Sequence, residues 1–394
     1  MSGPLTGFRV IDLTTTILGP YATQSLGDLG ADVIKVESPP TGDLARNLGE
    51  VRDVGMSGTY LNLNRNKRSI ALDLKSKKAL EVMRKLIATA DVFLHNMRPI
   101  AIARLGLGYE EVCGIKADII YAEGVGFGQS GPYRDKPAFD DVVQAASGLV
   151  DMFVKRDGRP SYVPTAIADK VTGLHLSQAV VAALLHRVRT GEGQKVEVPM
   201  FETLVAFNLV EHMSGGVFEP PGEVGYKRLL EASRRPFRTR DGYISILPYT
   251  DPQWLRFFAA IGRPQLMDDP LYATYRARIE NAEPLYQFVA SITPEKSASE
   301  WMDICVSNDI PCMPILTLGQ LARDVHLRAV GMFEDHLHPV AGCTHLVRSP
   351  MLFSKSPASI RRPAPRYGEH TAEIMRELGC GNGEGFVVAQ ADKS

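Results

Sequence analysis

Short apolar runs and a helix-like segment alternate along the first part of the chain. Residues 8–14 and 31–37 are rich in branched apolar side chains, which favour strands. Between them, Pro20 opens a predicted helix over residues 21–29, which Gly30 ends. Because a strand, a helix and a strand within about 30 residues form a βαβ unit, the pattern predicts a parallel sheet.

The same alternation continues into the middle of the chain. A helical pattern at 76–90 precedes apolar runs at 91–95 and 118–123, and a strand at 195–198 leads into a helix at 199–213. Ligands of parallel sheets bind beyond the carboxyl ends of the strands. These ends are predicted at residues 14–18, 37–46, 96–104 and 124–133.

The longest helical pattern begins near Asp169. From Val171 onward apolar residues recur at steps of three and four, and residues 177–186 contain few polar side chains, so we expect most of this helix to be buried. Asp169 stands where an N-cap or first-turn residue belongs. One interpretation is that Asp169 caps the helix. The other is that the helix dipole and free N–H groups hold its carboxylate ionised, so that it attacks an activated carbonyl as a nucleophile. The two interpretations are compatible.

Glycine and proline clusters divide the chain. Those at 214–216 and 219–222 predict a linker, and short helical patterns with many aromatic residues follow it. We therefore predict an α/β protein with a large Rossmann-like domain formed by both chain ends, residues 1–215 and 325–394. A smaller α/β domain at 225–320 is inserted between them.

Composition narrows the class of protein. Hydrophobic residues make up 44% and charged residues 23% of the chain, and 44 basic against 45 acidic side chains give a net charge of −1. These values are those of an ordinary globular protein and give no support to nucleic-acid binding. The five scattered cysteines form no Cys-x-x-Cys pair, so we expect a reducing compartment. With neither a signal peptide nor a long apolar stretch, a cytoplasmic protein without membrane contact is expected.

Familiar nucleotide-binding and hydrolase motifs are missing. The glycine cluster at 124–131 opens no helix in the first βαβ unit, so a flexible loop over a ligand, or a set of turns, fits better than a dinucleotide loop. The sequence has neither a P-loop nor a Gly-x-Ser-x-Gly elbow. His336, His338 and His345 come nearest to a metal site, but no cysteine or acidic partner completes it, so no metal is expected.

Basic residues concentrate near the predicted strand ends. They are Lys67, Arg68, Lys75, Arg98 and Arg104. Each one alone is most simply a solvated surface charge. Together they suit a ligand that carries several phosphates, because arginine binds phosphate bidentately and lysine acts as a point charge.

Several short segments occur in an order and spacing that match one enzyme family. They include Gly42-Asp43…Arg46, Asn96-Met-Arg-Pro99 and Gly368-Glu-His-Thr371. The other matching segments lie at 7–14, 30–37, 66–70, 72–75, 104–108, 127–132, 144–148 and 191–196. Together they span nearly the whole chain, which resembles the class III CoA-transferases, the CaiB/BaiF family.

The resemblance implies a reaction and its nucleophile. Asp169 would attack an acyl-CoA thioester to give a mixed anhydride and CoA thiolate, which would return to form an aspartyl-CoA thioester. A carboxylic acid would reverse these steps and leave as the new CoA ester. The helix N-terminus and the loop at Gly128 and Gly131 are candidates for the N–H donors that this chemistry needs. No ATP, metal or permanent cofactor is implied, since coenzyme A enters as the acyl-CoA substrate.

The resemblance also implies the CoA contacts and the assembly. The contacts fall on Leu72, Lys75, Asn96, Arg98 and Arg104, with Ile17 and Leu18 along the pantetheine path. The expected partner is a second copy of the chain, in a homodimer whose two chains interlock. The site at Asp169 would then lie at the domain and subunit interface.

Two positions and one missing loop bear on the substrate. Ser38 stands where some relatives have an arginine on the adenosine phosphates, and Ile17 stands where the formyl-CoA transferases have glutamine. The glycine-run loop of those enzymes is absent from the second domain, so an oxalate/formyl-CoA pair is disfavoured. Arg228, Arg234 and Arg235 either bind the distal carboxylate of a dicarboxylic acid such as succinate or form an exposed basic loop.

Three other functions compete with CoA transfer. An α-methylacyl-CoA racemase needs two opposed bases, and that branch has a His-Asp pair where this chain has Phe139-Asp140. A CoA-binding protein without catalysis is a second alternative, against which the retained Asp169 speaks. A nicotinamide oxidoreductase rests only on the βαβ start and lacks the glycine loop.

Overall fold

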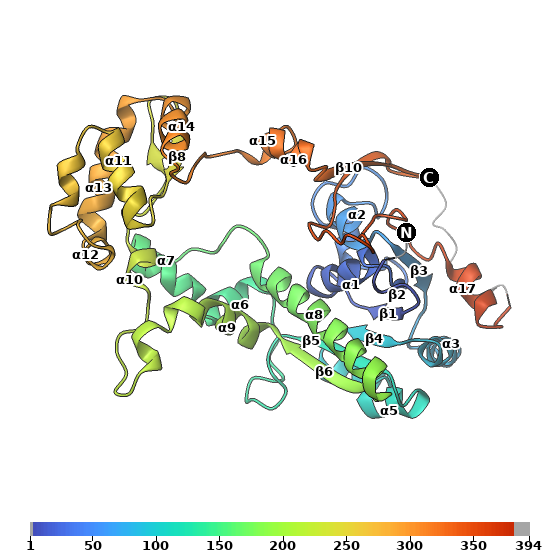
Figure 1. The fold of residues 1–394 in the computed structure, drawn as a ribbon. Coiled ribbons are helices and arrows are strands. Elements are labelled where there is room, and N and C mark those ends of the chain that lie inside the picture. The colour runs from blue at the N-terminus through green and yellow to red at the C-terminus, as the bar shows by residue number, and fades with distance from the viewer. Residues whose placement is uncertain (1–2, 382–394) are drawn as a thin grey trace. The chain divides into compact units, whose positions relative to one another are not determined.

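The computed structural model describes residues 3–381 of the chain. Its first six strands are β1 Arg9–Leu13, β2 Asp32–Glu37, β3 Lys67–Ala71, β4 Val92–His95, β5 Ile120–Val125 and β6 Gln194–Pro199. They form one sheet in the order β3-β2-β1-β4-β5-β6, and each neighbouring pair is parallel (Figure 1). The predicted parallel sheet is confirmed. Because the strand order reverses between β1 and β4, the ligand crevice of such a sheet lies at their carboxyl ends.

The strand β3 is not revealed by the sequence pattern, because two charged residues open it. Lys67 and Arg68 are both buried. Lys67 Nζ lies 3.0 Å from a carboxylate oxygen of Asp12, and Arg68 pairs with Asp32 and Glu377. Since carboxylates distant in sequence already compensate these two charges, the prediction that Lys67 and Arg68 belong to a phosphate site was wrong.

Helices cover both faces of this sheet (Figure 1). On one face, α3 (Lys77–Ala88), α5 (Tyr109–Ile115) and α17 (Thr371–Glu377) share a single hydrophobic cluster with the strands. On the other face, α1 (Leu18–Asp28) packs along α8 (Ile167–Thr190). This layered arrangement buries both faces, as a parallel sheet requires.

The contact between α1 and α8 depends on a glycine. A Cβ atom placed on Gly173 would lie 2.7 Å from the backbone oxygen of Leu18. No side chain fits at that distance, so the absence of one lets the two helices approach closely. The first turn of α8 is thereby held beside the first turn of α1.

A segment from the far end of the chain covers the edge of β3. The N–H of Ser69 donates to His370 Nδ1 at 3.2 Å, and the His370 N–H donates to the Ser69 carbonyl at 2.8 Å. The N–H of Ala71 donates to Thr371 Oγ1 at 3.1 Å, across 300 positions of sequence. An edge strand that would otherwise be open for pairing is thus closed.

Further helices and a strand pair accompany these elements. They are η1 Leu44–Asn47, α2 Gly58–Asn64, α4 Pro99–Arg104, α6 Asp140–Ala146, α9 Met200–His212, α16 Val325–Ala329 and the antiparallel pair β10 Phe333–His338 and β11 Gly342–Val347. Ser57 and Ser76 cap α2 and α3 with their hydroxyl groups, which fixes where these helices begin.

Residues 148–161 and 208–325 form a second compact unit, and the described residues up to 147, at 162–207 and from 326 form the first. The second unit contains the antiparallel sheet β7-β8-β9, made of Phe237–Arg238, Tyr243–Ile246 and Cys312–Pro314. Its helices are α7 Leu149–Asp157, η2 Ser214–Val217, α10 Lys227–Leu230, α11 Asp251–Ala260, η3 Pro264–Met267, α12 Tyr275–Glu280, α13 Ala282–Ile292, η4 Thr293–Glu295, α14 Ala298–Ser307 and α15 Leu318–Leu321.

This second unit has its own core and its own helix signals. Trp254, Phe257, Phe258 and Trp301 lie at the centre of one hydrophobic cluster. Capping boxes at Thr250 and Ser297 begin α11 and α14. The helix α7 falls within residues 1–215, which are predicted to be large domain, but it belongs to the second unit, where it packs against α10.

The helix α8 is less buried than its apolar pattern predicts. Its buried side carries small residues such as Ala168, Gly173 and Ala183, whereas Leu174, Leu185 and Val188 are 50%, 57% and 66% exposed. The prediction of a mostly buried helix was therefore wrong for the single chain. No helix within residues 3–381 combines the length and apolar character needed to cross a membrane.

Candidate active site

Asp169 lies in the first turn of α8 but does not cap it with its side chain. The N-cap residue is Ala166, which has no side chain able to accept a hydrogen bond from the helix. Instead, the Asp169 N–H donates to a carboxylate oxygen of Asp140 at 3.0 Å. The capping interpretation of the Asp169 side chain is therefore wrong, and Asp140, from the start of α6, holds this turn.

Asp140 is itself fixed by a buried amide. Gln144, one turn further along α6, donates from Nε2 to the other Asp140 oxygen at 2.6 Å. Its Oε1 accepts the Val163 N–H at 2.9 Å, in the segment that leads into α8. Gln144 is fully buried, so this side chain ties α6 to the start of α8. Gln144 belongs to the segment at 144–148 that matches the enzyme family, but the neighbouring sequence does not indicate that it bonds to Asp140 and Val163.

The environment of Asp169 favours its protonated form. Burial first, and the charge of Asp140 second, raise the pKa of the Asp169 carboxyl from its ordinary 3.8 to about 7. The α8 dipole favours the anion, but the loss of water and the second carboxylate outweigh it. The expectation that the helix terminus holds this carboxylate ionised was wrong in direction.

The Asp169 carboxylate has no partner within the described chain. Among residues 3–381 no cation pairs with it and no donor hydrogen-bonds to it, while its backbone N–H is used by Asp140. A carboxylate that is half-buried, unpaired and close to half-ionised at neutral pH is more basic, and hence more nucleophilic, than an ordinary aspartate.

The loop between β1 and α1 carries two of the predicted CoA contacts. Leu18 is buried and Ile17 is half-buried at its end. Asn96, just beyond β4, accepts the Thr15 N–H at 3.0 Å and donates to the Thr15 carbonyl at 2.9 Å. The structure thus brings Asn96 together with the loop of Ile17 and Leu18, and commits its amide to the backbone of that loop.

The predicted phosphate contacts follow the carboxyl ends of β3 and β4. Lys75, Arg98 and Arg104 are exposed, and within the described chain no carboxylate pairs with any of them. Leu72 differs, because its side chain is buried in the hydrophobic cluster and its N–H donates to the Glu37 carbonyl. The three cations are therefore free to meet anionic groups from solvent.

The predicted glycine loop is held by two acidic side chains. The Gly128 N–H donates to Glu202 Oε1 and the Gln129 N–H donates to Glu197 Oε1, each at 2.9 Å. The Gly131 N–H donates to the Gly128 carbonyl at 3.1 Å. That the N–H groups of Gly128 or Gly131 stabilise an oxyanion stays a prediction. It requires these N–H groups to release the oxygens to which they now donate.

In the second unit, Arg234 and Arg235 line a cavity of about 140 Å³. Arg235 already pairs with Asp157 at 2.7 Å, and Arg228 donates to the Tyr286 hydroxyl at 3.1 Å. The Arg234 Nε, in contrast, is buried and has no hydrogen-bond partner in the described residues. Of the three arginines, Arg234 therefore has unused donor capacity at this cavity.

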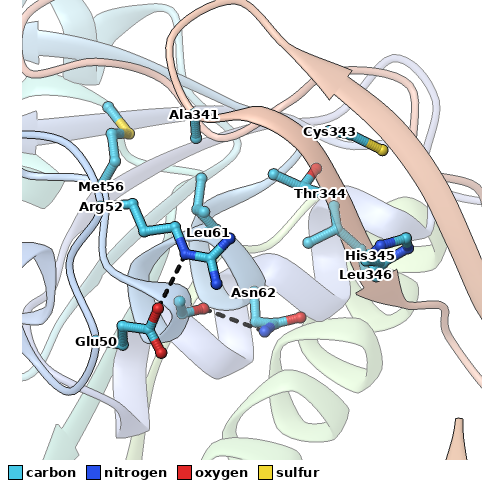
Figure 2. A pocket seen from close by; sticks show the side chains of 11 residues that line it. Glu50, Arg52, Met56, Leu61, Asn62, Ala341, Cys343, Thr344, His345 and Leu346 are labelled. Atoms are coloured by element: carbon cyan, nitrogen blue, oxygen red, sulfur yellow. Dashed lines mark hydrogen bonds and ion pairs between the residues drawn. The ribbon is translucent and has the colours of Figure 1, made fainter.

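A larger cavity contains none of the predicted site residues. It measures about 260 Å³ and lies between α2 and β11 (Figure 2). Several of its polar groups already have partners, as in the ion pair of Arg52 with Glu50 at 2.9 Å and the bond from Asn62 to the Gly58 carbonyl at 3.1 Å. We therefore do not assign the reaction to this cavity.

The histidines that resemble a metal cluster have separate partners. His336 Nε2 lies 3.1 Å from Glu334, and His338 Nε2 lies 2.8 Å from the Ala364 carbonyl oxygen. Among residues 3–381 no group of three or more His, Cys, Asp or Glu side chains is arranged to hold a metal ion.

Comparison with known proteins identifies the family. The model of CoA-transferase family III matches residues 5–371. The chain is 34% identical over 382 residues to the succinate–glutarate CoA-transferase of Agrobacterium fabrum, covering 95% of this chain and 96% of that one. It is 34% identical over 406 residues to the formyl-CoA:oxalate CoA-transferase of Afipia carboxidovorans, covering 96% and 94%. The crystal structure of a CaiB/BaiF family protein from Brucella suis matches with a TM-score of 0.82 at 30% identity, covering 96% and 100%.

The chain belongs to CoA-transferase family III, and the predicted family is confirmed. The protein is therefore an enzyme, a transferase that moves coenzyme A to a carboxylic acid.

Proposed function

We propose that this protein transfers coenzyme A from an acyl-CoA donor to a dicarboxylic acid through covalent intermediates on Asp169. The observation that carries the proposal is the half-buried, unpaired Asp169 carboxylate with a pKa of about 7 at the start of α8. Such a group is a stronger nucleophile than a solvated aspartate when ionised.

Each step exchanges one acyl bond for another. The Asp169 carboxylate attacks the thioester carbonyl, which forms a mixed anhydride and expels CoA thiolate. The thiolate attacks the Asp169 carbonyl of the anhydride, which forms the aspartyl-CoA thioester and releases the donor as its acid. The acceptor carboxylate then attacks this thioester, and the expelled thiolate takes the acceptor acyl group and frees Asp169. One thioester is consumed and one is formed, so the sequence needs no other energy source.

The CoA moiety is proposed to bind along the carboxyl edge of the sheet. The unpaired Lys75, Arg98 and Arg104 suit its phosphates, because exposed cations without a carboxylate partner lose no ion pair on binding. The half-buried Ile17 offers apolar surface for the pantetheine arm, and the buried Leu18 and Leu72 contribute through their backbone. Asn96 acts by holding Thr15, which lies next to them in the loop.

A dicarboxylic acceptor is supported by the relatives and by Arg234. The two relatives described above are named for succinate, glutarate and oxalate. In this chain, the Arg234 Nε is a buried donor without an acceptor. A second carboxylate would satisfy it with a charge-assisted hydrogen bond. Arg235 is less suited, because Asp157 already occupies it.

The exposed apolar side chains of α8 support a homodimer. Leu174, Leu185 and Val188 project from one helix and are each at least half exposed. Apolar side chains clustered in this way on a chain surface mark an interface. We propose that a second copy of the chain covers them, in the interlocked arrangement that family membership implies.

The test is to trap the intermediate. Incubation with succinyl-CoA followed by hydroxylamine is expected to leave a hydroxamate on Asp169, located by peptide mass spectrometry. Asp169→Ala should lose both the label and the transfer of CoA to glutarate. Asp141→Ala, which removes an exposed carboxylate next to Asp140, should keep both. A label on another residue, or turnover by Asp169→Ala, would contradict the proposal.

The racemase alternative lacks a second base at the expected position. Phe139 is 72% exposed and has no titratable group. Incubation with a chiral 2-methylacyl-CoA in deuterated water, without an acceptor acid, separates the two functions. Deuterium at the α-carbon would indicate the racemase.

A further inference from the structure

The loop between β1 and α1 is held by side chains from several parts of the sheet. Asp12 accepts the Thr14 N–H at 3.0 Å, and Lys35 Nζ donates to the Thr14 carbonyl at 2.9 Å. Asn96 binds both the N–H and the carbonyl of Thr15. Consecutive polar groups of this backbone therefore have side-chain partners, which fix the conformation of the loop.

Asp43 makes the last of these contacts, at Thr16. Its Oδ1 accepts the Thr16 N–H at 2.8 Å and the Ala45 N–H at 2.9 Å. Its Oδ2 lies 2.7 Å from Lys35 Nζ, and both side chains are fully buried. One carboxylate therefore joins the loop to β2 and to η1.

Thr16 needs such support because its backbone is strained. Its φ angle is +74°, in the left-handed region that residues with a Cβ atom rarely adopt. For a residue other than glycine this conformation is unfavourable, because the Cβ atom approaches the following carbonyl oxygen. Hydrogen bonds to charged groups are stronger than those between neutral groups, so the bond from Thr16 to Asp43 offsets this strain.

We propose that Asp43 is a positioning residue for coenzyme A, which acts by holding Thr16 in this conformation and thereby setting Ile17 and Leu18 on the pantetheine path. The inference rests on the proposed CoA site. Asp43 is buried, so it acts through the loop and not by direct contact with the substrate. Asp43 sets the fraction of protein molecules in which the loop between β1 and α1 has the conformation that binds coenzyme A. The apparent affinity for coenzyme A falls in proportion as this fraction falls.

A purely structural role for the buried ion pair is the competing explanation, and the chain offers a matched control. Arg65 and Asp28 form a similarly buried pair at 2.7 Å. Asp28 ends α1, at the opposite end of the helix from Ile17, and it contacts none of the predicted site residues. Asp28→Ala should therefore lower stability without changing the loop before α1.

The experiment compares Asp43→Ala with Asp28→Ala in the full chain. Binding of free coenzyme A is measured by titration calorimetry, with KM for acyl-CoA, KM for the acid and Tm alongside. Asp43→Ala is expected to weaken coenzyme A binding about tenfold, which corresponds to 1.4 kcal/mol, and to raise KM for acyl-CoA with KM for the acid little changed. Asp28→Ala should lower Tm and leave coenzyme A binding unchanged.

A second substitution tests the backbone directly. Glycine adopts positive φ without a steric penalty, so Thr16→Gly added to Asp43→Ala should restore most of the affinity without restoring Tm. Should Asp43→Ala not fold, Asp43→Asn replaces it. Its neutral amide oxygen is a weaker acceptor for the Thr16 N–H than a carboxylate, so this variant should bind coenzyme A more weakly than the wild type, again with recovery by Thr16→Gly.

Three results would overturn the inference. They are unchanged coenzyme A binding in the Asp43 variant, an equal loss in Asp28→Ala, or no recovery by Thr16→Gly. Failure of the proposed CoA site looks different, since the wild-type protein itself would then bind no coenzyme A; failure of the proposed transfer through Asp169 would leave coenzyme A binding, and the effect of Asp43→Ala on it, unchanged.

Discussion

Replacing Asp169 with asparagine measures how much the buried, unpaired carboxylate lowers the free energy of unfolding. The pKa of Asp169 is raised from 3.8 to about 7, a difference of about 3 units. At 1.36 kcal/mol for each unit, the fully ionised side chain destabilises the fold by about 4 kcal/mol. Asparagine has the same shape and carries no charge, so it should remove this cost.

The sign of the pH dependence follows from which state holds the proton. Below pH 3.8 Asp169 is protonated in both the folded and the unfolded chain, and it has no effect. Between 3.8 and about 7 the unfolded chain loses the proton while the folded chain keeps it, so the free energy of unfolding falls as pH rises. The cost is about 1.6 kcal/mol at pH 5 and reaches about 4 kcal/mol at pH 8.

Asp169→Asn should therefore be more stable than the wild type, and more so at pH 8 than at pH 5. Solvent near the half-buried carboxylate reduces the difference, so we expect an additional gain of at least about 1 kcal/mol at pH 8. Urea unfolding followed by far-UV circular dichroism measures it. Tryptophan fluorescence is unsuitable, because Trp254 and Trp301 both lie in the second unit.

Asp141→Asn serves as the control, since Asp141 is exposed. It should change stability little and equally at both pH values. If Asp169→Asn gained no more stability at pH 8 than at pH 5, the raised pKa, and with it the argument for the nucleophile, would be refuted.

Two further predictions concern the neighbours of the proposed site. Asp140→Asn removes the negative charge that is the second cause of the raised Asp169 pKa. The acidic limb of the pH profile of kcat/KM, expected near pH 7, should therefore move to lower pH. If the limb does not move, Asp140 does not act through its charge. Arg234→Met should raise KM for glutarate about tenfold, the value of one charge-assisted hydrogen bond, while a monocarboxylic acceptor and the matched variant Arg235→Met change little. Equal effects on both acids would remove Arg234 from the acceptor site.

Local patterns predict the parts of the fold that depend on local sequence. β1, β2, β4 and α1 follow from apolar periodicity and from the positions of Gly30 and Pro20. β3 is hidden because Lys67 and Arg68 are charged, and what makes them compatible with burial lies far away in the chain, on Asp12 and Glu377. Charge compensation of this kind is invisible to a local window.

In the candidate active site too, local sequence predicts where residues lie, whereas distant residues determine their chemistry. The position of Asp169 at the start of a helix follows from the sequence, but its protonation depends on burial and on Asp140, which only the fold brings near. Asn96 lies beside the expected loop, yet its amide binds Thr15. The sequence locates such residues, and their hydrogen bonds depend on residues that are distant along the chain.

The closure of β3 by residues 370 and 371 has a consequence during synthesis. The ribosome completes this strand some 300 residues before it makes Thr371, which accepts the Ala71 N–H. Throughout that interval the nascent chain presents an open strand edge, a template for pairing with other chains. Chaperone binding to the unfinished polypeptide, and insolubility of chains that stop short of α17, are the cellular effects to look for.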